Sequence, residues 1–548
     1  MKPASPAWVL AAAALYVALG LGLAARHLDE PGLYYDEVIQ AGPAVEFLRA
    51  DGEPLRVPGA RSVRAFGGWL PWMTQPYMGA LKSLALVPVF ALFEADAVVL
   101  RAATLLWALL AVPFAMLFAN RLVGGAAALV AGALLAVDPS LLFLGRHDWG
   151  SFALGLLLRC AGLFAVLRGF QLPSTASVAV GGTCLGLGVY NKIDFGIFLA
   201  GAALALAVAA PAVLWRCLRE ERARIAAGAA GFALGALPLL LALGGALSVT
   251  GAAARGGSLA GDLAEKWSVL GTVLDGSHFQ RLMLAGGRFE DLSQVAGAAG
   301  GPGAALVLAG LLAIGAFRLI PRLREAGDRG AGFLALATVL VLAGVLLTPR
   351  ALRAHHYANV LPLPQLVVAT AAVMLWQRAD RVAAWAGRGM ALLMVAGTLV
   401  ASLRIDVATL ATLRDTGGRG RWSHAVEELA RELPADTRVV SLDWGFDGPV
   451  RFVAPDLATD EPIWRLRRGG AAARLAGGPR DLYLVHEPRF AVMPFGDALL
   501  AALEDLPDGA ARVRVHGDRA GEPVLRSVRF TRPHVLTYRS GRFSVEWR

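Results

Sequence analysis

Long apolar stretches recur along the first three quarters of the chain and constrain its fold more than any other feature. A helix needs about 20 consecutive apolar residues to cross a bilayer core. Stretches near this length occupy residues 7–25, 98–119, 123–143, 150–168, 176–191, 194–214, 225–247, 302–319, 331–348, 358–376 and 388–405. Hydrophobic residues make up 56% of the 548 residues and charged residues 17%, outside the range of soluble globular domains. The sequence therefore predicts a polytopic α-helical membrane protein with about eleven transmembrane helices.

Three arginine-rich linkers orient these predicted spans, because cytoplasmic loops are enriched in Lys and Arg. The linkers are residues 215–224, 317–330 and 377–388, and an even number of spans separates each from the next. All three then face the cytoplasm, and counting back places the N-terminus there too. This parity requires that residues 79–93, a short apolar stretch containing Lys82 and Pro88, do not cross the membrane.

The same orientation leaves three long segments outside the cytoplasm: residues 26–97, 248–301 and a tail from about 406 to 548. Within the tail, "RWSHAVEELARELP" predicts an amphipathic helix, and "TRVVSLDW", "DLYLVHEP", "ARVRVHGD" and "VLTYRS" predict short strands. We therefore expect a transmembrane domain over 1–405 and an extracytoplasmic α/β domain over 406–548.

Charge and cysteine content narrow the function classes. The net charge of +10 is expected in cytoplasmic loops of a membrane protein and does not indicate a nucleic-acid partner. The three cysteines lie in or beside apolar stretches without CxxC spacing, which argues against a disulfide framework or a cysteine metal site. The first apolar run has no convincing cleavage site, and we interpret it as a retained helix.

Four polar clusters fall in predicted extracytoplasmic loops. The first is the pair Asp36 and Glu37 in "GLYYDEVIQAG" (32–42). The second is His147 and Asp148 in "FLGRHDWGSF", and the third contains Lys192 in "YNKIDFG" (190–196). The fourth, "TPRALRAHHYANVLPLP" (348–364), supplies Arg350, Arg353, His355, His356 and Tyr357.

The signs of these charges suggest a reaction at the membrane surface. Arg350 and Arg353 lie on the extracytoplasmic side against the usual bias, and Arg can hold a phosphate bidentately. Carboxylates nearby can act as a general base on a hydroxyl or bind a cation such as Mg²⁺ or Mn²⁺. Together these residues point to chemistry between a lipid phosphate and a nucleophile.

The order of these motifs resembles that of the GT-C glycosyltransferases. "YYDE" in the first outer loop, "RHD" after "DPSLLFLGR", a lysine after the fifth span and "HHYANVLPLP" are similar to the branch that contains protein O-mannosyltransferases and lipid A aminoarabinose transferases (family 39). The resemblance covers roughly residues 1–405. The spacing of Arg and Asp in "GRHDWG" is shorter than is common in the family, and the tail matches no family.

The resemblance implies a transferase that takes sugar from a polyprenyl-phosphate donor and passes it to a hydroxyl acceptor at the extracytoplasmic face. It implies that Asp36 is the catalytic base, supported by Glu37, and that Asp148 is a second acidic residue of the active site. It also implies that Lys192, Arg350 and Arg353 neutralise the donor phosphate, and we place Tyr357 with them. His147, His355 and His356 are further candidates.

Simpler interpretations stay open for these residues. His147 and Asp148 could cap the next helix, and Lys192 could extend from a helix end to the membrane surface. His355 and His356 are adjacent on a predicted helix and point apart, which does not favour joint metal ligation. The acidic pair could be ordinary loop residues.

Two other functions compete with the transferase. A flippase or transporter for a lipid-linked sugar would use the same cations to bind phosphate, but it should carry ionisable groups along its spans. The second alternative is an inactive GT-C scaffold whose tail binds a partner. The Ala-, Gly- and Arg-rich composition suggests a GC-rich genome and hence a bacterial inner membrane.

Overall fold

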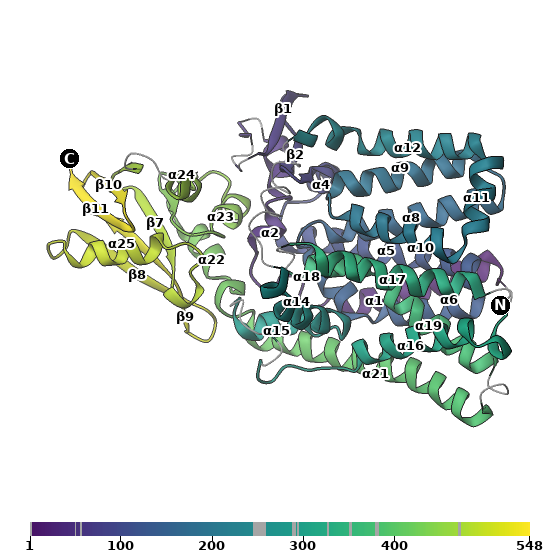
Figure 1. The fold of residues 1–548 in the computed structure, drawn as a ribbon. Coiled ribbons are helices and arrows are strands. Elements are labelled where there is room, and N and C mark those ends of the chain that lie inside the picture. The colour runs from purple at the N-terminus through teal and green to yellow at the C-terminus, as the bar shows by residue number, and fades with distance from the viewer. Residues whose placement is uncertain are drawn as a thin grey trace.

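The chain folds into a helix bundle joined to a C-terminal domain of mixed α and β structure (Figure 1). The structure is a computed structural model. It describes all residues except 1–2, 50, 55–56, 58, 245–258, 288–291, 293–294, 326–327, 350–352, 379–382 and 469–472. The N-terminus lies at the end of the bundle remote from the C-terminal domain (Figure 1). We call the opposite end, which carries this domain, the domain end of the bundle.

The long helices coincide with the apolar stretches of the sequence. They are α1 (Pro6–Ala24), α5 (Ala97–Val123), α6 (Gly125–Ala136), α8 (Phe152–Gln171), α9 (Thr175–Asn191), α10 (Phe195–Ala209), α11 (Pro211–Glu220), α12 (Arg222–Leu241), α16 (Gly303–Leu319), α17 (Arg329–Leu347), α19 (Leu363–Gln377) and α21 (Ala384–Thr416). Each of the eleven predicted spans overlaps one of these helices or a bent pair. Within the described residues, seven helices are long and apolar enough to cross a membrane, or nine if each bent pair counts as one span.

Two predicted spans are broken. The stretch at 194–214 forms α10 and α11, which meet at an angle of 101°, and Pro211 begins α11. A proline lacks the N–H that would continue the helix from α10. The stretch at 123–143 bends by 60° between α6 and the residues Ser140–His147, next to Pro139.

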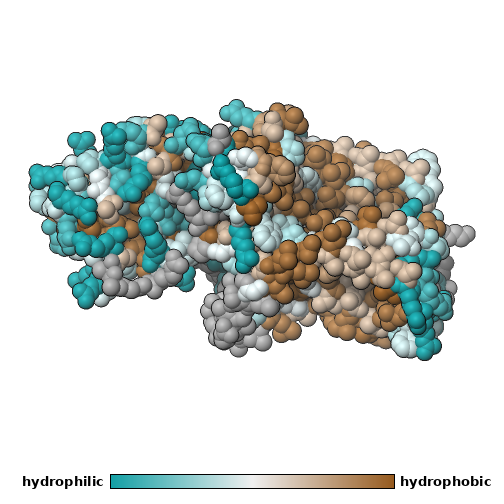
Figure 2. All heavy atoms as spheres, turned by 90° about the horizontal axis from the view of Figure 1, so that it is seen from above, coloured by the Kyte–Doolittle hydropathy of each residue, from teal (hydrophilic) through white to brown (hydrophobic). Residues whose placement is uncertain are grey.

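An apolar belt covers the face of the bundle seen in Figure 2, with hydrophilic residues beyond it at both ends. Large apolar side chains are exposed along the helices, where water would be an unfavourable neighbour: Leu15, Leu234, Leu312, Leu392 and Val400. A surface of this kind suits the hydrocarbon of a bilayer. The prediction of a polytopic membrane protein is confirmed.

Shorter elements cover the domain end. They are α2 (Tyr35–Val38), α3 (Gly42–Leu48), β1 (Arg61–Ala65), β2 (Gly68–Gln75), β3 (Met78–Gly79), α4 (Leu81–Leu92), α7 (Gly145–His147), α14 (Leu259–Leu274), α15 (His278–Ala285) and α18 (Ala354–Tyr357). The strands pair antiparallel in the order β1-β2-β3. At 12 residues, α4 is about 18 Å long and cannot cross a core about 30 Å thick.

The C-terminal domain follows α21, which runs through the predicted boundary at 405/406. Its helices are α22 (Ala425–Glu432), α23 (Asp447–Val453), α24 (Ile463–Arg468) and α25 (Phe495–Glu504). Its strands are β4 (Arg438–Ser441), β5 (Ala458–Asp460), β6 (Ala473–Gly477), β7 (Asp481–His486), β8 (Ala511–Gly517), β9 (Pro523–Phe530), β10 (His534–Arg539) and β11 (Arg542–Trp547). A five-stranded mixed sheet has the order β5-β4-β7-β9-β8, and a three-stranded sheet the order β11-β10-β6.

The C-terminal domain docks on the segment that precedes α2. Gly32 N–H donates to the carbonyl of Trp422 at 2.7 Å, and Leu33 N–H donates to Glu427 Oε1 at 2.6 Å. Glu30 accepts a hydrogen bond from His424 at 2.7 Å. These bonds fix the entry into α2 against the domain, and they position the residues described next.

Candidate active site

A cavity of about 690 Å³ lies at the junction of the bundle and the C-terminal domain. Sites that enclose a small organic ligand commonly have volumes of about 300–1,000 Å³. The polar and charged residues that line it include Asp36, Glu265, Ser268, His278, Arg353 and His355. Its aromatic lining residues are Tyr34, Trp149, Trp422, Trp444 and Trp464.

Asp36 reaches this cavity from the short helix α2. Its carboxyl is partly exposed there, while Tyr34 and Tyr35 beside it are buried. Burial raises the pKa of Asp36 to about 6, and the nearby positive charges of Lys192, Arg353 and Lys82 limit the rise. A carboxylate with this pKa is ionised near neutral pH and is basic enough to accept a proton.

Glu37, the next residue, does not line the cavity. It is buried, and the guanidinium of Arg101 in α5 donates to both of its oxygens, at 2.7 and 3.0 Å. Arg101 also donates to the carbonyls of Leu28 and Gly32. This bidentate pair holds α2 against α5. The structure thus places Glu37 where it can position Asp36.

Asp148 is not among the residues that line the cavity, and it forms a buried ion pair with Lys82 of α4. Lys82 Nζ is 3.0 Å from Asp148 Oδ2, and it donates to the carbonyls of Glu37 and Asp148 at 3.3 Å. The other Asp148 oxygen accepts from the N–H of Ala153 at 2.6 Å, near the start of α8. Burial raises the pKa of Asp148, and Lys82 opposes this effect. The contact with Ala153 agrees with the expected position of Asp148 at a helix start, whereas the ion pair with Lys82 was not expected from the sequence.

The turn after Asp148 brings two more candidates together. Asp148, Gly150 and Ser151 have positive φ angles of 48°, 74° and 59°. A Cβ placed on Gly150 would lie 3.1 Å from Lys192 Nζ and 3.3 Å from the ring of His355. The absence of a side chain at Gly150 therefore lets Lys192 and His355 approach the turn closely.

Lys192 is neutralised on one side by Asp194. Lys192 Nζ lies 3.1 Å from Asp194 Oδ2, and His356 Nδ1 lies 3.0 Å from the same oxygen. Burial alone would raise the pKa of Asp194, but Lys192 and His356 hold it well below its ordinary range. His356 therefore contacts Asp194 and does not line the cavity, whereas His355 does.

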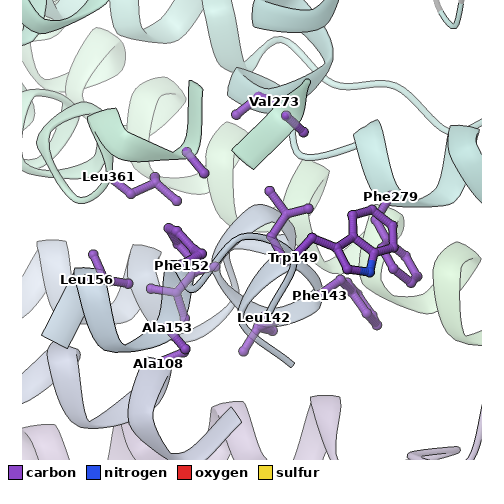
Figure 3. Close-up of a cluster of buried hydrophobic side chains, with 14 of the residues drawn as sticks. Ala108, Leu142, Phe143, Trp149, Phe152, Ala153, Leu156, Val273, Phe279 and Leu361 are labelled. Atoms are coloured by element: carbon purple, nitrogen blue, oxygen red, sulfur yellow. The ribbon is translucent and has the colours of Figure 1, made fainter. Parts of the chain in front are cut away.

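The remaining predicted residues have mixed positions. Arg353 lines the cavity and lies 3.4 Å from Glu265 of α14. Tyr357 is fully buried and does not line the cavity. Arg350 lies outside the described residues. His147 is buried and stacks on Phe279 with ring centroids 4.5 Å apart. Phe279 lies beside Trp149 and Phe143 in a cluster of buried side chains (Figure 3). His147 is therefore a packing residue in this arrangement.

Sequence reasoning missed several residues of this site. Lys82 carried a signal, because a lysine inside an apolar stretch usually has a partner or a function. Arg101 is likewise a charged residue inside an apolar stretch, the one that forms α5. The tryptophans of the C-terminal domain carried none, since only the docking of that domain brings them to the cavity. Within the described part of the chain, no group of three or more His, Cys, Asp or Glu residues is arranged to hold a metal ion.

Comparison with solved structures identifies the architecture. ArnT from Cupriavidus metallidurans bound to undecaprenyl phosphate is 16% identical, with a TM-score of 0.51; the match covers 96% of this chain and 98% of that one. ArnT in the apo state is 14% identical and covers 95% and 98% of the two chains, also with a TM-score of 0.51. ArnT is a member of the GT-C superfamily. The chain has a GT-C fold.

The GT-C fold spans both the helix bundle and the C-terminal domain, since the match to ArnT is nearly full length. A weaker match is the archaeal oligosaccharyltransferase AglB from Archaeoglobus fulgidus in complex with an inhibitory peptide and a dolichol-phosphate. It is 14% identical, has a TM-score of 0.46, and covers 82% of this chain and 64% of AglB. No protein-family model matches the sequence, and no curated protein matches it. The predicted GT-C architecture is confirmed at the level of the fold.

Proposed function

We propose that this protein transfers a sugar from a polyprenyl-phosphate donor to a hydroxyl acceptor inside the junction cavity. The observation that carries the proposal is Asp36, a carboxylate with a raised pKa that faces the cavity beside Lys192, Arg353 and Lys82. A base next to several cations suits a reaction in which a hydroxyl loses a proton while a phosphate departs. The GT-C fold shared with ArnT, which was solved with undecaprenyl phosphate bound, supports this donor class.

The proposed step is a single displacement. The acceptor oxygen attacks the anomeric carbon and forms the new C–O bond, while the bond from that carbon to the phosphate oxygen breaks. The hydroxyl proton passes to the Asp36 carboxylate, and the bonding electron pair leaves with the prenyl phosphate. One displacement inverts the configuration at the anomeric carbon.

Charge stabilisation of the leaving phosphate falls to Arg353 and Lys192. Arg353 lines the cavity, and Lys192 lies within reach of the same region, next to Gly150 and His355. Fixed cations in a site screened from bulk water stabilise developing charge more strongly than they do in water. The imidazole of His355 can donate one hydrogen bond to the leaving phosphate. Glu37, bound by Arg101, and the Asp148–Lys82 pair hold the backbone around Asp36 in place.

The membrane orientation follows from the same proposal. The arginine-rich residues of α11 lie at the end of the bundle opposite the C-terminal domain (Figure 1). We propose that this end and the N-terminus face the cytoplasm of a bacterium. The cavity and the C-terminal domain then face the extracytoplasmic side of the inner membrane.

A transfer assay with purified protein tests the proposal. Detergent-solubilised wild type and Asp36→Asn are incubated with radiolabelled sugars on prenyl phosphate and with a panel of hydroxyl acceptors. Loss of a general base lowers rates by about 10²-fold or more. Asp29→Asn is the matched control, an exposed aspartate in the same loop. We expect wild type and the control to transfer sugar and Asp36→Asn to lose at least that much activity.

Two results would contradict the proposal. Equal transfer by Asp36→Asn and wild type would remove Asp36 from the chemistry. Binding of prenyl phosphate with no transfer from any donor would instead support a flippase or an inactive scaffold.

A further inference from the structure

The two walls of the junction cavity differ in chemistry. Among its described lining residues, all the acidic and basic ones come from the bundle side: Asp36, Glu265, His278, Arg353 and His355. The C-terminal domain and its connection to α21 contribute Trp422, Trp444, Trp464, Val492 and Met493. We call these five residues the tryptophan wall. The charged lining thus comes from the bundle, and three of the five aromatic lining residues come from the tryptophan wall.

The tryptophan wall is held in place by a buried carboxylate. Asp443 accepts hydrogen bonds from the backbone N–H groups of Trp444, Val492 and Met493, at 2.7 to 3.1 Å. It also contacts His486 Nδ1 at 3.1 Å. One fully buried side chain therefore fixes three wall residues from two separate segments. Such preorganisation is typical of binding surfaces.

Aromatic contacts fix the ring planes as well. Trp444 lies against Tyr35 and Tyr34, with ring centroids 4.7 and 5.5 Å apart. Trp422 stacks on Trp149 at 4.7 Å and 22°. The aromatic side chains therefore form a continuous surface from α2 to the C-terminal domain, and their rings are not free to rotate independently.

The direction of the proposed displacement assigns the two walls. In a single displacement the acceptor approaches opposite the leaving group. The leaving phosphate belongs with Arg353 and His355, so the acceptor lies on the other side of the anomeric carbon, within reach of Asp36. Trp444 contacts Tyr34 and Tyr35, which directly precede this base in the chain, so the tryptophan wall begins where the acceptor must lie. The prenyl tail is a poor occupant of that wall, because the C-terminal domain lies beyond the helix ends, outside the apolar belt (Figures 1 and 2).

A second pocket continues from the wall through Trp464, which lines both cavities. This pocket has a volume of about 290 Å³ and is also lined by Tyr35, Asp447 and Glu461. Trp464 Nε1 donates to Glu461 Oε2 at 2.8 Å, while Glu461 Oε1 has no hydrogen-bond partner among the described residues. Burial and the charge of Asp447 raise the pKa of Glu461 to about 8, so at neutral pH this carboxyl is mostly protonated. An indole face next to a carboxyl group offers both an apolar surface and a hydrogen-bond partner for hydroxyl groups.

We propose that the acceptor is a glycan of at least two sugar rings, which stacks on Trp444 and Trp464 and extends into the second pocket. Its apolar ring faces contact the indoles, and its hydroxyls form hydrogen bonds with Glu461 and Asp447. The reacting hydroxyl of the first ring then points to Asp36. The inference rests on the proposed function, and it distinguishes a glycan acceptor from a serine or threonine side chain of a protein.

Binding measurements on the full-length protein in detergent test this inference separately from transfer. The probes are a neutral hexose tetrasaccharide, a serine-containing octapeptide and undecaprenyl phosphate, each titrated by calorimetry. The variants are Trp464→Leu, which removes the ring, Trp464→Phe, which keeps one, and Glu461→Gln. Trp215→Leu in α11, at the opposite end of the bundle, is the matched control.

We expect the tetrasaccharide to bind wild type, and its Kd to rise about tenfold in Trp464→Leu and much less in Trp464→Phe. Undecaprenyl phosphate should bind all variants equally, which also shows that each variant is folded. Binding of the octapeptide but not the tetrasaccharide would overturn the inference, as would tetrasaccharide binding that Trp464→Leu leaves unchanged. Failure of undecaprenyl phosphate to bind wild type would count against the proposed function instead.

Discussion

Asp36 and Glu37 are neighbours in sequence and have different tasks in the structure. Asp36 faces the cavity and has no ion-pair partner within contact distance among the described residues, whereas Glu37 is bound on both oxygens by Arg101. A four-residue helix turns the two side chains in different directions. The pair thus combines one reactive carboxylate with one that fixes its backbone, because a base must be held in place to act.

The pKa of Asp36 predicts the pH dependence of transfer. Asp36 accepts a proton only when ionised, and burial raises its pKa to about 6. We expect kcat/KM to be level at neutral pH and to fall about tenfold per pH unit below 6. Arg353→Gln removes a nearby positive charge and should move this limb to higher pH, whereas Arg451→Gln in α23 should not. A profile that stays level down to pH 5 would contradict the role of Asp36.

At the scale of single elements, the turn at 148–151 connects the most parts of the site. It carries Asp148 with its partner Lys82, and Gly150 lies against Lys192 and His355. Asp148 and Ser151 are non-glycine residues with positive φ angles, and backbone strain of this kind concentrates at functional sites. The turn is therefore the element whose backbone conformation the site depends on most.

Gly150→Ala tests this dependence. A left-handed conformation costs a residue with a Cβ about 1–2 kcal/mol, and the new methyl would press on Lys192 and His355. We expect a lower unfolding temperature and a clear loss of transfer. Gly22→Ala in α1, where a Cβ meets no atom within 4 Å, is the matched control and should retain both. Equal behaviour of the two variants would show that the turn is not under constraint.

Elements with a strong local pattern could be predicted from the sequence, and long-range contacts could not. Each apolar stretch became a helix or a bent pair, and the predicted strands of the tail are β4, β7, β8 and β10. The 101° bend at Pro211 could have been predicted, because a proline usually ends or kinks a helix. By contrast, Arg101 and Glu37 are 64 residues apart, and nothing local to either one identifies the other.

The candidate site was predictable only where its residues belong to local sequence motifs. Asp36, Arg353 and His355 line the cavity as expected of residues in one reaction, and their roles stay predictions. His147 and Tyr357 are buried in packing positions that no sequence pattern reveals. The tryptophan wall depends on how a whole domain docks, which is a property of the complete fold.

On the scale of the whole molecule, the C-terminal domain closes the site. His424 lies between Glu30 and Glu427, at 2.7 and 3.3 Å, and Arg519 also contacts Glu30. Although burial opposes it, these two glutamates raise the pKa of His424 to about 9. Its stabilising contribution is complete below its ordinary pKa near 6.5 and is lost as the pH rises through 9. The domain is thus held in place throughout the neutral range.

The location of the donor phosphate is the most direct test of a junction active site. A cryo-electron microscopy structure of full-length Asp36→Asn, mixed with a polyprenyl-phosphate sugar, would retain the uncleaved donor. We expect the phosphate beside Arg353 and Lys192, with the anomeric carbon of the sugar between the phosphate and position 36. A phosphate bound elsewhere, such as at the α11 end of the bundle, with the junction cavity empty, would contradict the proposal.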